Sequence, residues 1–281
     1  MSTVDSAAPL PEPSAHGPTE HGPAVHARKA GFVADVATIA GRALRGIPRE
    51  PEAIIPALVV PVFFYVINIG ALQKVAERGP VTDFKAFQLP VAIVFAVTGV
   101  SRASALVTDI QGGYFDRLLI TPVRRLALLL GLMVADFALV ISLSVPVVVL
   151  GFALGVRFET GLAGVLVFLL VAGSWGLVFT GFPYAIALKT GNPAAVNSSF
   201  ILFFPFAFLT TAFLPREALT GWLATIATYN PVTYLLAGLR SLVLTGWDGL
   251  ALVKAVGAVV GVGVVSMSLA LAALRGRVRR G

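Results

Sequence analysis

The 281-residue sequence has no cysteine, and its three histidines, His16, His21 and His26, all lie in the first 30 residues. No disulfide, thiolate metal site or cysteine nucleophile is therefore possible within the chain. The rest of the chain lacks histidine, the usual general base and metal ligand near neutral pH. We therefore expect no catalytic residue and no metal site, and a membrane-embedded enzyme is disfavoured.

Charged side chains are also scarce, at 12% of the residues against 57% hydrophobic ones. Soluble domains carry about a quarter charged residues, and the mean hydropathy of +0.89 points instead to a bilayer as the solvent. Because one spanning helix needs about 20 apolar residues, the length allows roughly six spans with their loops and no second soluble domain.

The N-terminal part divides into two predicted segments. Residues 1–31 form a polar tail without an apolar run, expected to be disordered and cytoplasmic, so that the first span acts as the insertion signal. Residues 32–48 predict an amphipathic interface helix that lies along the cytoplasmic membrane surface. An ordinary surface helix is the alternative. The apolar face comprises Phe32, Val36, Ile39, Ala43 and Ile47, and the polar face comprises Asp35, Thr38, Arg42 and Arg45.

The remaining residues, 49–281, predict a single transmembrane domain. Six apolar stretches cover about 53–70, 87–108, 126–154, 162–187, 194–214 and 250–274. With the N-terminus inside, 14 of the 21 lysines and arginines fall on the cytoplasmic side, so the positive-inside rule places both termini in the cytoplasm. This distribution explains the net charge of +7 without nucleic acid as a partner.

The link between the last two spans, about residues 215–249, is apolar but is interrupted by Asn230-Pro231. Two short helical pieces are expected there, as a reentrant pair that enters the outer interface without crossing. A seventh and an eighth span are the alternative. The predicted fold class is thus all-α integral membrane, with six transmembrane helices, the interface helix and the reentrant pair.

The most informative loop joins the second and third spans, between Asp109 and Arg125. The pair Gly112-Gly113 ends the preceding helix and Pro122 stops the next one, which leaves a short cytoplasmic helix. On it Phe115, Leu118 and Leu119 share a face. So short a helix is unstable alone and is expected to dock onto a cytoplasmic partner, or alternatively beneath its own spans.

These residues carry a resemblance to the type-2 ABC exporter permeases. The stretch from Gly113 to Pro122 resembles the motif in the first cytoplasmic loop of that family, and Asn230-Pro231-Val232-Thr233-Tyr234 resembles its Asn-Pro-x-Thr-Tyr motif in the reentrant segment. The run Gly-Tyr-Phe-Asp-Arg-Leu-Leu-x-Thr-Pro-Val is most similar to the daunorubicin and multidrug-resistance branch. Gln111 and Gly112 stand where many members carry an acidic–basic pair.

The resemblance implies a coupling helix that fits a groove of a separate ATP-binding subunit. Its ATPase-coupling residues would be Tyr114, Phe115, Asp116, Arg117, Leu118, Leu119, Thr121 and Pro122. The chain contains no Gly-Lys dipeptide, hence no Walker A loop, so ATP and Mg are expected on the partner and no cofactor on this chain.

The implied assembly is a plasma-membrane complex of two permease copies, a homodimer or a heterodimer, with two ATPases. Its implied function is export of a hydrophobic small molecule, such as a drug or antibiotic, by alternating access. Export of a lipid or lipid-linked glycan, and an ATP-independent channel or transporter, remain the alternatives.

Two further sets of residues are candidates for function within the spans. Asn197, Phe204, Phe208 and Thr211 share a predicted stripe of the fifth span, which the resemblance places beside the substrate path; contact of the phenylalanines with lipid is the alternative. Arg102 and Asp136 are charges within the second and third spans, and such groups usually have partners. A salt bridge between them is the hypothesis, with snorkelling of Arg102 as the alternative.

Overall fold

The computed structural model describes residues 31–46, 51–79, 81–113 and 125–278, and these residues form helices joined by turns and loops. The α-helices are α1 (Phe32–Gly46), α2 (Pro51–Ala76), α3 (Phe84–Thr98), α4 (Ala103–Gln111), α6 (Arg125–Ala153), α7 (Gly161–Phe179), α8 (Gly181–Thr190), α9 (Pro193–Ser198), α10 (Phe203–Phe208), α11 (Gly221–Tyr229), α12 (Pro231–Leu244) and α13 (Gly249–Val278). Two 3₁₀ turns are η2 (Ser199–Leu202) and η3 (Arg216–Ala218).

Five helical runs are long and apolar enough to cross a membrane. They are Ile54–Ala76, Phe84–Gln111, Leu129–Ala153, Gly161–Thr190 and Gly249–Arg277. Each corresponds to one of the six predicted spans. The Phe84–Gln111 run is interrupted between α3 and α4. The Gly161–Thr190 run is divided at Thr180 into α7 and α8.

The remaining predicted span, 194–214, forms a shorter and broken run. It consists of α9, η2 and α10, and residues 209–214 after it are irregular. At 1.5 Å per residue, Pro193–Phe208 extends roughly 24 Å, less than the roughly 30 Å hydrocarbon core. Pro205 removes a backbone donor within this run, which contributes to its irregularity.

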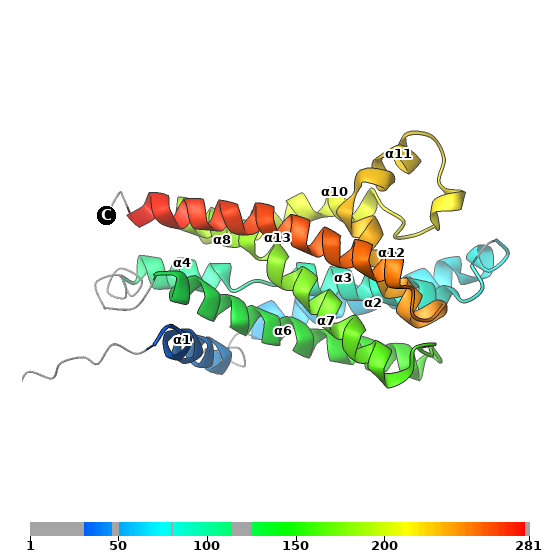
Figure 1. The fold of residues 1–281 in the computed structure, drawn as a ribbon, viewed down its shortest axis with the longest axis horizontal. Helices are drawn as coiled ribbons and strands as arrows, with labels where there is room; N and C mark the ends of the chain where they lie inside the picture. The colour runs from blue at the N-terminus through cyan, green and yellow to red at the C-terminus, as the bar shows by residue number, and fades with distance from the viewer. Residues whose placement is uncertain (1–30, 47–50, 80, 114–124, 279–281) are drawn as a thin grey trace, which may run out of the picture.

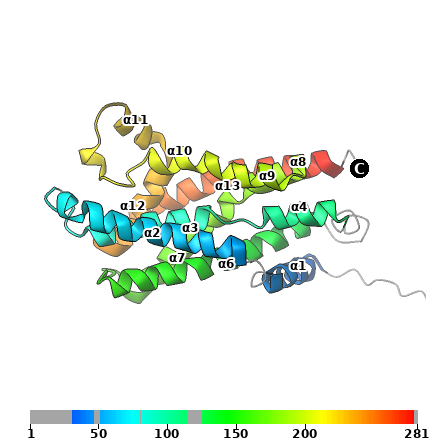
Figure 2. The same cartoon turned by 180° about the vertical axis from the view of Figure 1, so that it is seen from behind.

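The helices form an elongated bundle with two distinct ends (Figures 1 and 2). One end holds α1, α4 and the C-terminal end of α13. The other holds α11 and the connections from α2 to α3 and from α6 to α7. The two ends therefore contain different elements: the amphipathic helix α1 and the end of α13 at one, and the short helix α11 at the other.

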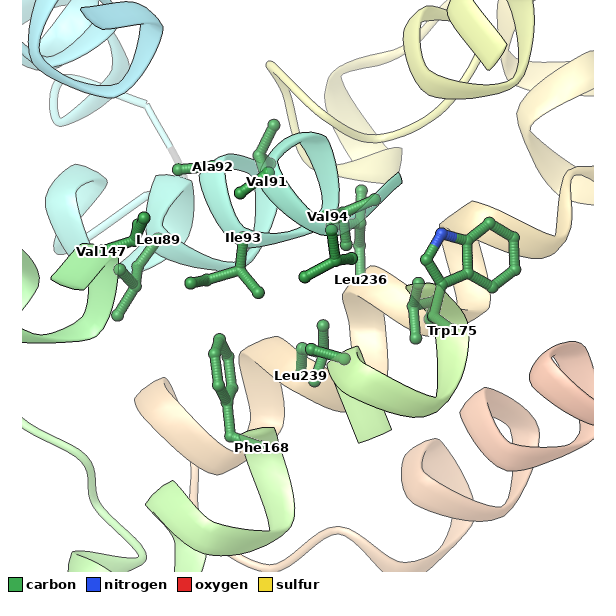
Figure 3. Close-up of a cluster of buried hydrophobic side chains, with 14 of the residues drawn as sticks. Leu89, Val91, Ala92, Ile93, Val94, Val147, Phe168, Trp175, Leu236 and Leu239 are labelled. Atoms are coloured by element: carbon green, nitrogen blue, oxygen red, sulfur yellow. The ribbon is translucent and has the colours of Figure 1, made fainter. Parts of the chain in front are cut away.

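The core lies around α3, which is buried along almost its entire length. Figure 3 shows side chains of α3, such as Ile93, facing Phe168 of α7 and Leu239 of α12. These three side chains are fully buried. The helix α12 is thus part of the core and packs on α13 as well as on α3 and α7.

Helix α1 packs along α6 through a close contact at a glycine. A methyl group added at Gly131 of α6 would lie 2.6 Å from the Cβ of Ile39 and 3.1 Å from the carbonyl oxygen of Val36. The predicted apolar face therefore covers α6. Asp35, predicted on the polar face, is buried, whereas Val33 and Leu44 are exposed. The spacing of apolar residues therefore predicted the buried face of α1 incorrectly at these positions, because the sequence does not show that α6 covers that face.

The contact at Gly131 yields a testable expectation. Gly131→Ala should lower the unfolding temperature by several degrees, since overpacking costs about 1–3 kcal/mol. Gly257→Ala is the matched control, because nothing lies within 4 Å of a Cβ at that helical position. Both changes add the same helix propensity. Thermal unfolding in detergent measures the difference, and equal unfolding temperatures would refute the close packing of α1 on α6.

Candidate functional site

At the interruption between α3 and α4, a carboxylate from another helix accepts a backbone hydrogen bond. The backbone N–H of Arg102, just before α4, donates to Oδ1 of Asp136 on α6 at 2.9 Å. The hydroxyl of Tyr184 on α8 donates to Oδ2 of the same carboxylate at 2.6 Å. Asp136 is fully buried, and the positive end of the α4 dipole favours a negative charge there. Asp136 therefore satisfies a backbone N–H at the start of α4 from another helix.

The side chain of Arg102 extends toward the end of α1. A Cβ at Gly46 would lie 3.0 Å from Nη2 of Arg102, so the guanidinium lies against the last residue of α1. The sequence analysis paired the side chains of Arg102 and Asp136, whereas the contact given above is made by the Arg102 backbone. A salt bridge between their side chains stays a prediction. Tyr184 was missed, because nothing local marks a tyrosine in an apolar helix.

The end of α3 is held by a second polar contact within the core. The indole Nε1 of Trp175 on α7 donates to Oγ1 of Thr98 at 3.0 Å, and that hydroxyl donates to the carbonyl of Val94 at 2.6 Å. Both Trp175 and Thr98 are buried. The interruption is therefore fixed on its α3 side by α7 and on its α4 side by α6 and α8.

A second interruption, between α11 and α12, is organised by Asn230. Its side-chain oxygen accepts from the N–H of Val232 at 3.0 Å and so caps α12. Its amide nitrogen donates to the carbonyls of Phe206 and Leu209 at 2.8 and 2.9 Å, at the end of α10. One side chain thus satisfies backbone groups of two helices that are separate in sequence.

The other residues of the predicted reentrant motif complete this corner. Pro231 occupies the first turn of α12, where its missing N–H costs nothing. The Tyr234 hydroxyl donates to the carbonyl of Thr228 at 2.6 Å and closes the turn back onto α11. Thr233 is buried on the first turn of α12. The predicted break at Asn230-Pro231 into two short helices is confirmed.

Arg240 on α12 is an important residue that the sequence analysis missed. It is buried, and its Nε donates to the carbonyl of Phe87 at 3.0 Å. Its terminal nitrogens donate to Thr211 Oγ1 at 3.3 Å and to the Ala212 carbonyl at 3.2 Å. Its guanidinium carbon also lies 3.4 Å from the centre of the Phe87 ring. An arginine within an otherwise apolar helix was the available signal.

A continuous series of aromatic side chains, which we call the aromatic chain, joins four helices. It comprises Phe64 on α2, Phe95 on α3, Phe203 and Phe208 on α10, and Phe179 and Trp175 on α7. Neighbouring ring centroids are 5.4 to 6.5 Å apart. Phe204 stacks on Phe208 at 5.8 Å and extends the chain toward the surface. The predicted aromatic residues of the fifth segment therefore lie together.

The two polar members of the predicted substrate stripe lie apart from these rings. Asn197 on α9 is exposed, and its Oδ1 accepts from Ser104 Oγ of α4 at 3.0 Å. Thr211 lies beyond the end of α10, is buried, and contacts Arg240. The four residues therefore do not form one helical stripe, because the helix breaks at η2 and ends at Phe208.

An apolar groove adjoins the aromatic chain between α10 and α13. It encloses about 340 Å³. Its lining consists of Trp175, Phe179, Phe182, Phe206, Pro231, Ala258, Gly261, Val262 and Val265. This surface offers ring faces and aliphatic groups, which suits a hydrophobic guest.

The predicted coupling residues, Tyr114 to Pro122, lie outside the described residues. The flanking structure agrees with the predicted end of the preceding helix: α4 ends at Gln111, and Gly113 has a left-handed φ of 68°. Within the described residues, no group of three or more His, Asp or Glu side chains could hold a metal ion.

Comparison with known proteins identifies relatives over most of the chain. The ABC-2 type transporter family matches residues 35–244. The daunorubicin resistance ABC transporter permease protein DrrB1 of Streptomyces coeruleorubidus is 28% identical over 204 residues, covering 72% of each chain. The probable doxorubicin resistance ABC transporter permease protein DrrC of Mycobacterium tuberculosis is 25% identical, covering 76% of this chain and 79% of the relative.

The putative transport permease ycf38 of Cyanophora paradoxa is 25% identical and covers 75% of this chain and 74% of its own length.

The contact between Asp136 and the start of α4 can be tested by removing the hydroxyl that holds Asp136. Tyr184→Phe should lower the free energy of unfolding by about 1–3 kcal/mol, because the buried Asp136 carboxylate loses a donor. Tyr229→Phe is the matched control, since Tyr229 is 83% exposed. Denaturation in detergent measures both variants. If both lose the same stability, the Tyr184–Asp136 hydrogen bond does not support the interruption.

Proposed function

The chain belongs to the ABC-2 type transporter family, and we propose that it is the permease subunit of an ATP-driven exporter of hydrophobic small molecules, such as drugs or antibiotics. The observation that carries this proposal is the family match, which extends from α1 to the end of α12. The relatives named for daunorubicin and doxorubicin resistance support the substrate class.

The exterior of the bundle supports a multi-pass membrane protein that also contacts a second copy. Few residues of α2 and α13 are buried in the subunit, and their exposed side chains include large apolar ones such as Phe63 and Val264. Lipid would cover such surfaces, and a partner subunit would cover part of them. We propose a complex of two permeases and two ATPases in the plasma membrane.

We further propose six spans, with the broken α9–α10 run completing the bundle as the fifth. The helices α11 and α12 would form the reentrant pair at the outer face. Non-helical backbone at membrane depth is tolerated only where protein or water covers it. The hydrogen bonds from Asn230 to the α10 carbonyls provide such cover.

The end of the bundle that holds α1 and α4 would then face the cytoplasm. The coupling segment, residues 114–122, joins α4 to α6 and would therefore lie at this end, where α4 ends and α6 begins. The segment and α1 together would contact the ATP-binding subunit. Because the sequence has no Gly-Lys dipeptide, that subunit would bind ATP and Mg.

The substrate would pass beside α10 during alternating access. Phe204 and Phe208 are 41% and 39% exposed, so their stacked rings are available to a flat, apolar molecule. The apolar groove between α10 and α13 lies on another side of the same short helix. Both surfaces favour a hydrophobic drug over an ion or a bare sugar.

Coupling to the ATPase can be tested on the predicted loop. Phe115→Ala and Leu119→Asp should abolish transport-coupled ATPase stimulation, because each removes an apolar group from the docking face. Membrane insertion should be unchanged. Leu162→Asp, on the exposed start of α7 at the opposite end, is the control for a new charge. Normal co-purification and stimulation of the ATPase in both loop variants would disprove the docking role.

The substrate path can be tested by resistance in cells. Phe204→Ala and Asn197→Ala should each lower drug resistance several-fold, through loss of a stacking ring and of a hydrogen-bonding group. Leu166→Ala, 64% exposed on α7, is the control for truncation of an exposed apolar side chain. Resistance in both variants equal to wild type, at equal expression, would exclude these residues from the path.

A further inference from the structure

Gln88, near the start of α3, carries a carboxamide into the apolar interior of the bundle. The residue is 1% exposed, and its Nε2 has no hydrogen-bond partner within the part of the chain that the structure describes. The residues on either side, Phe87 and Leu89, are buried and apolar. An amide donor in such surroundings is costly to leave unpaired. The Gln88 amide is therefore available to donate to a ligand.

A narrow cavity of about 20 Å³ lies at this amide, between α2, α3 and α10. Its lining includes Phe64 and Asn68 of α2, Gln88 and Phe95 of α3, and Phe208 at the end of α10. A cavity of this volume has room for about one water molecule. It can therefore also take a single oxygen substituent of a larger molecule.

Two of the lining rings also reach the surface of the subunit. Phe64 is 45% exposed and Phe208 is 39% exposed. The ring of Phe95 lies between them, stacked against Phe64 with 6.5 Å between centroids and edge-on to Phe208 at 5.7 Å. A flat aromatic molecule can therefore rest on the two exposed rings while one of its substituents enters the cavity.

The polar groups of the lining determine which substituent fits. The Tyr65 hydroxyl donates to the carbonyl of Lys85 at 3.0 Å, so its proton is already used. The amide of Gln88 remains as a donor for the ligand, and Asn68 adds a second carboxamide. All of the lining side chains are uncharged. A neutral oxygen, such as a ring carbonyl or hydroxyl, matches an amide donor, whereas a charged group would be buried without a counterion.

We propose that Gln88 anchors the substrate: its amide donates to the carbonyl or hydroxyl oxygen of a flat aromatic molecule whose rings rest on Phe64 and Phe208. The substrate class is thereby narrowed from hydrophobic molecules in general to planar aromatic ketones, quinones and phenols. Transport of such a molecule rests on the export function proposed above. Its binding rests on the cavity between α2, α3 and α10.

The experiment compares two probes of similar shape, anthraquinone and anthracene, of which only anthraquinone carries ring carbonyls. Binding to the purified full-length permease in detergent is measured by equilibrium dialysis. Wild type should bind anthraquinone more tightly than anthracene. Gln88→Leu should weaken anthraquinone binding about tenfold, the upper size expected for one neutral hydrogen bond, and should not weaken anthracene binding.

Three further variants complete the test. Gln73→Leu is the matched control, because Gln73 lies near the end of α2 and its amide donates to Glu77 at 3.0 Å; it should bind both probes as wild type does. Phe208→Ala should weaken both probes, since both rest on its ring. Gln88→Met keeps the length of the side chain without the amide, and serves if the branched leucine disturbs folding.

Thermal unfolding separates anchoring from packing. Both Gln88 variants should unfold at the wild-type temperature or above it, because an unpaired buried amide is removed. Equal wild-type affinity for the two probes, or full anthraquinone binding by both Gln88 variants, would show that the cavity holds no substrate oxygen. Equal loss of both probes would make Gln88 a packing residue instead of a donor.

None of these measurements involves ATP or transport. If the binding result fails while drug resistance depends on the permease, only the role of Gln88 is wrong. If the permease confers no resistance but the two probes are distinguished through Gln88, the site stands and the export proposal is wrong.

Discussion

A helix that breaks inside a bilayer exposes backbone amides and carbonyls that hydrocarbon cannot hydrogen-bond. This constraint explains the placement of the buried polar side chains in the bundle. At the break before α4, Asp136 accepts from the Arg102 amide and is itself held by Tyr184. At the break before α12, Asn230 serves α12 and the end of α10 together. In each case the hydrogen-bond partner comes from a distant part of the chain. Each interruption is therefore held by contacts between helices that are far apart in sequence.

The same constraint applies to the charged side chain of Arg240, whose donors also need hydrogen-bond partners. A buried guanidinium in an apolar helix is costly unless its donors are satisfied. Here they reach the carbonyl of Phe87, the hydroxyl of Thr211 and the carbonyl of Ala212, with the Phe87 ring against the cation. Together with Asn230, this residue ties α12 to α3 and to the chain around α10. In the proposed transport cycle, a movement of α10 would therefore involve α12.

The two ends of the bundle present different side chains and elements. The end with α1 and α4 presents the arginines of α1, whereas the opposite end presents the short helix α11. Between them, the exterior of α2 and α13 is apolar and little buried by the subunit itself. Because such surfaces need lipid or protein to cover them, the isolated chain is only part of the proposed exporter.

The sequence by itself determined those features that depend on local chemistry. Apolar runs predicted six spans, and five of them are helices long and apolar enough to cross a membrane. Gly112-Gly113 predicted the end of α4, and Asn230-Pro231 predicted the break before α12, because each signal acts through the conformation of its own residues. Only the tertiary structure decided which residues satisfy the broken backbone: Tyr184 and Arg240 make contacts that local patterns do not encode. It also decided that the α9–α10 run ends at Phe208 and that Asp35 is buried, because in a chain this apolar, periodicity cannot tell which face meets protein and which meets lipid.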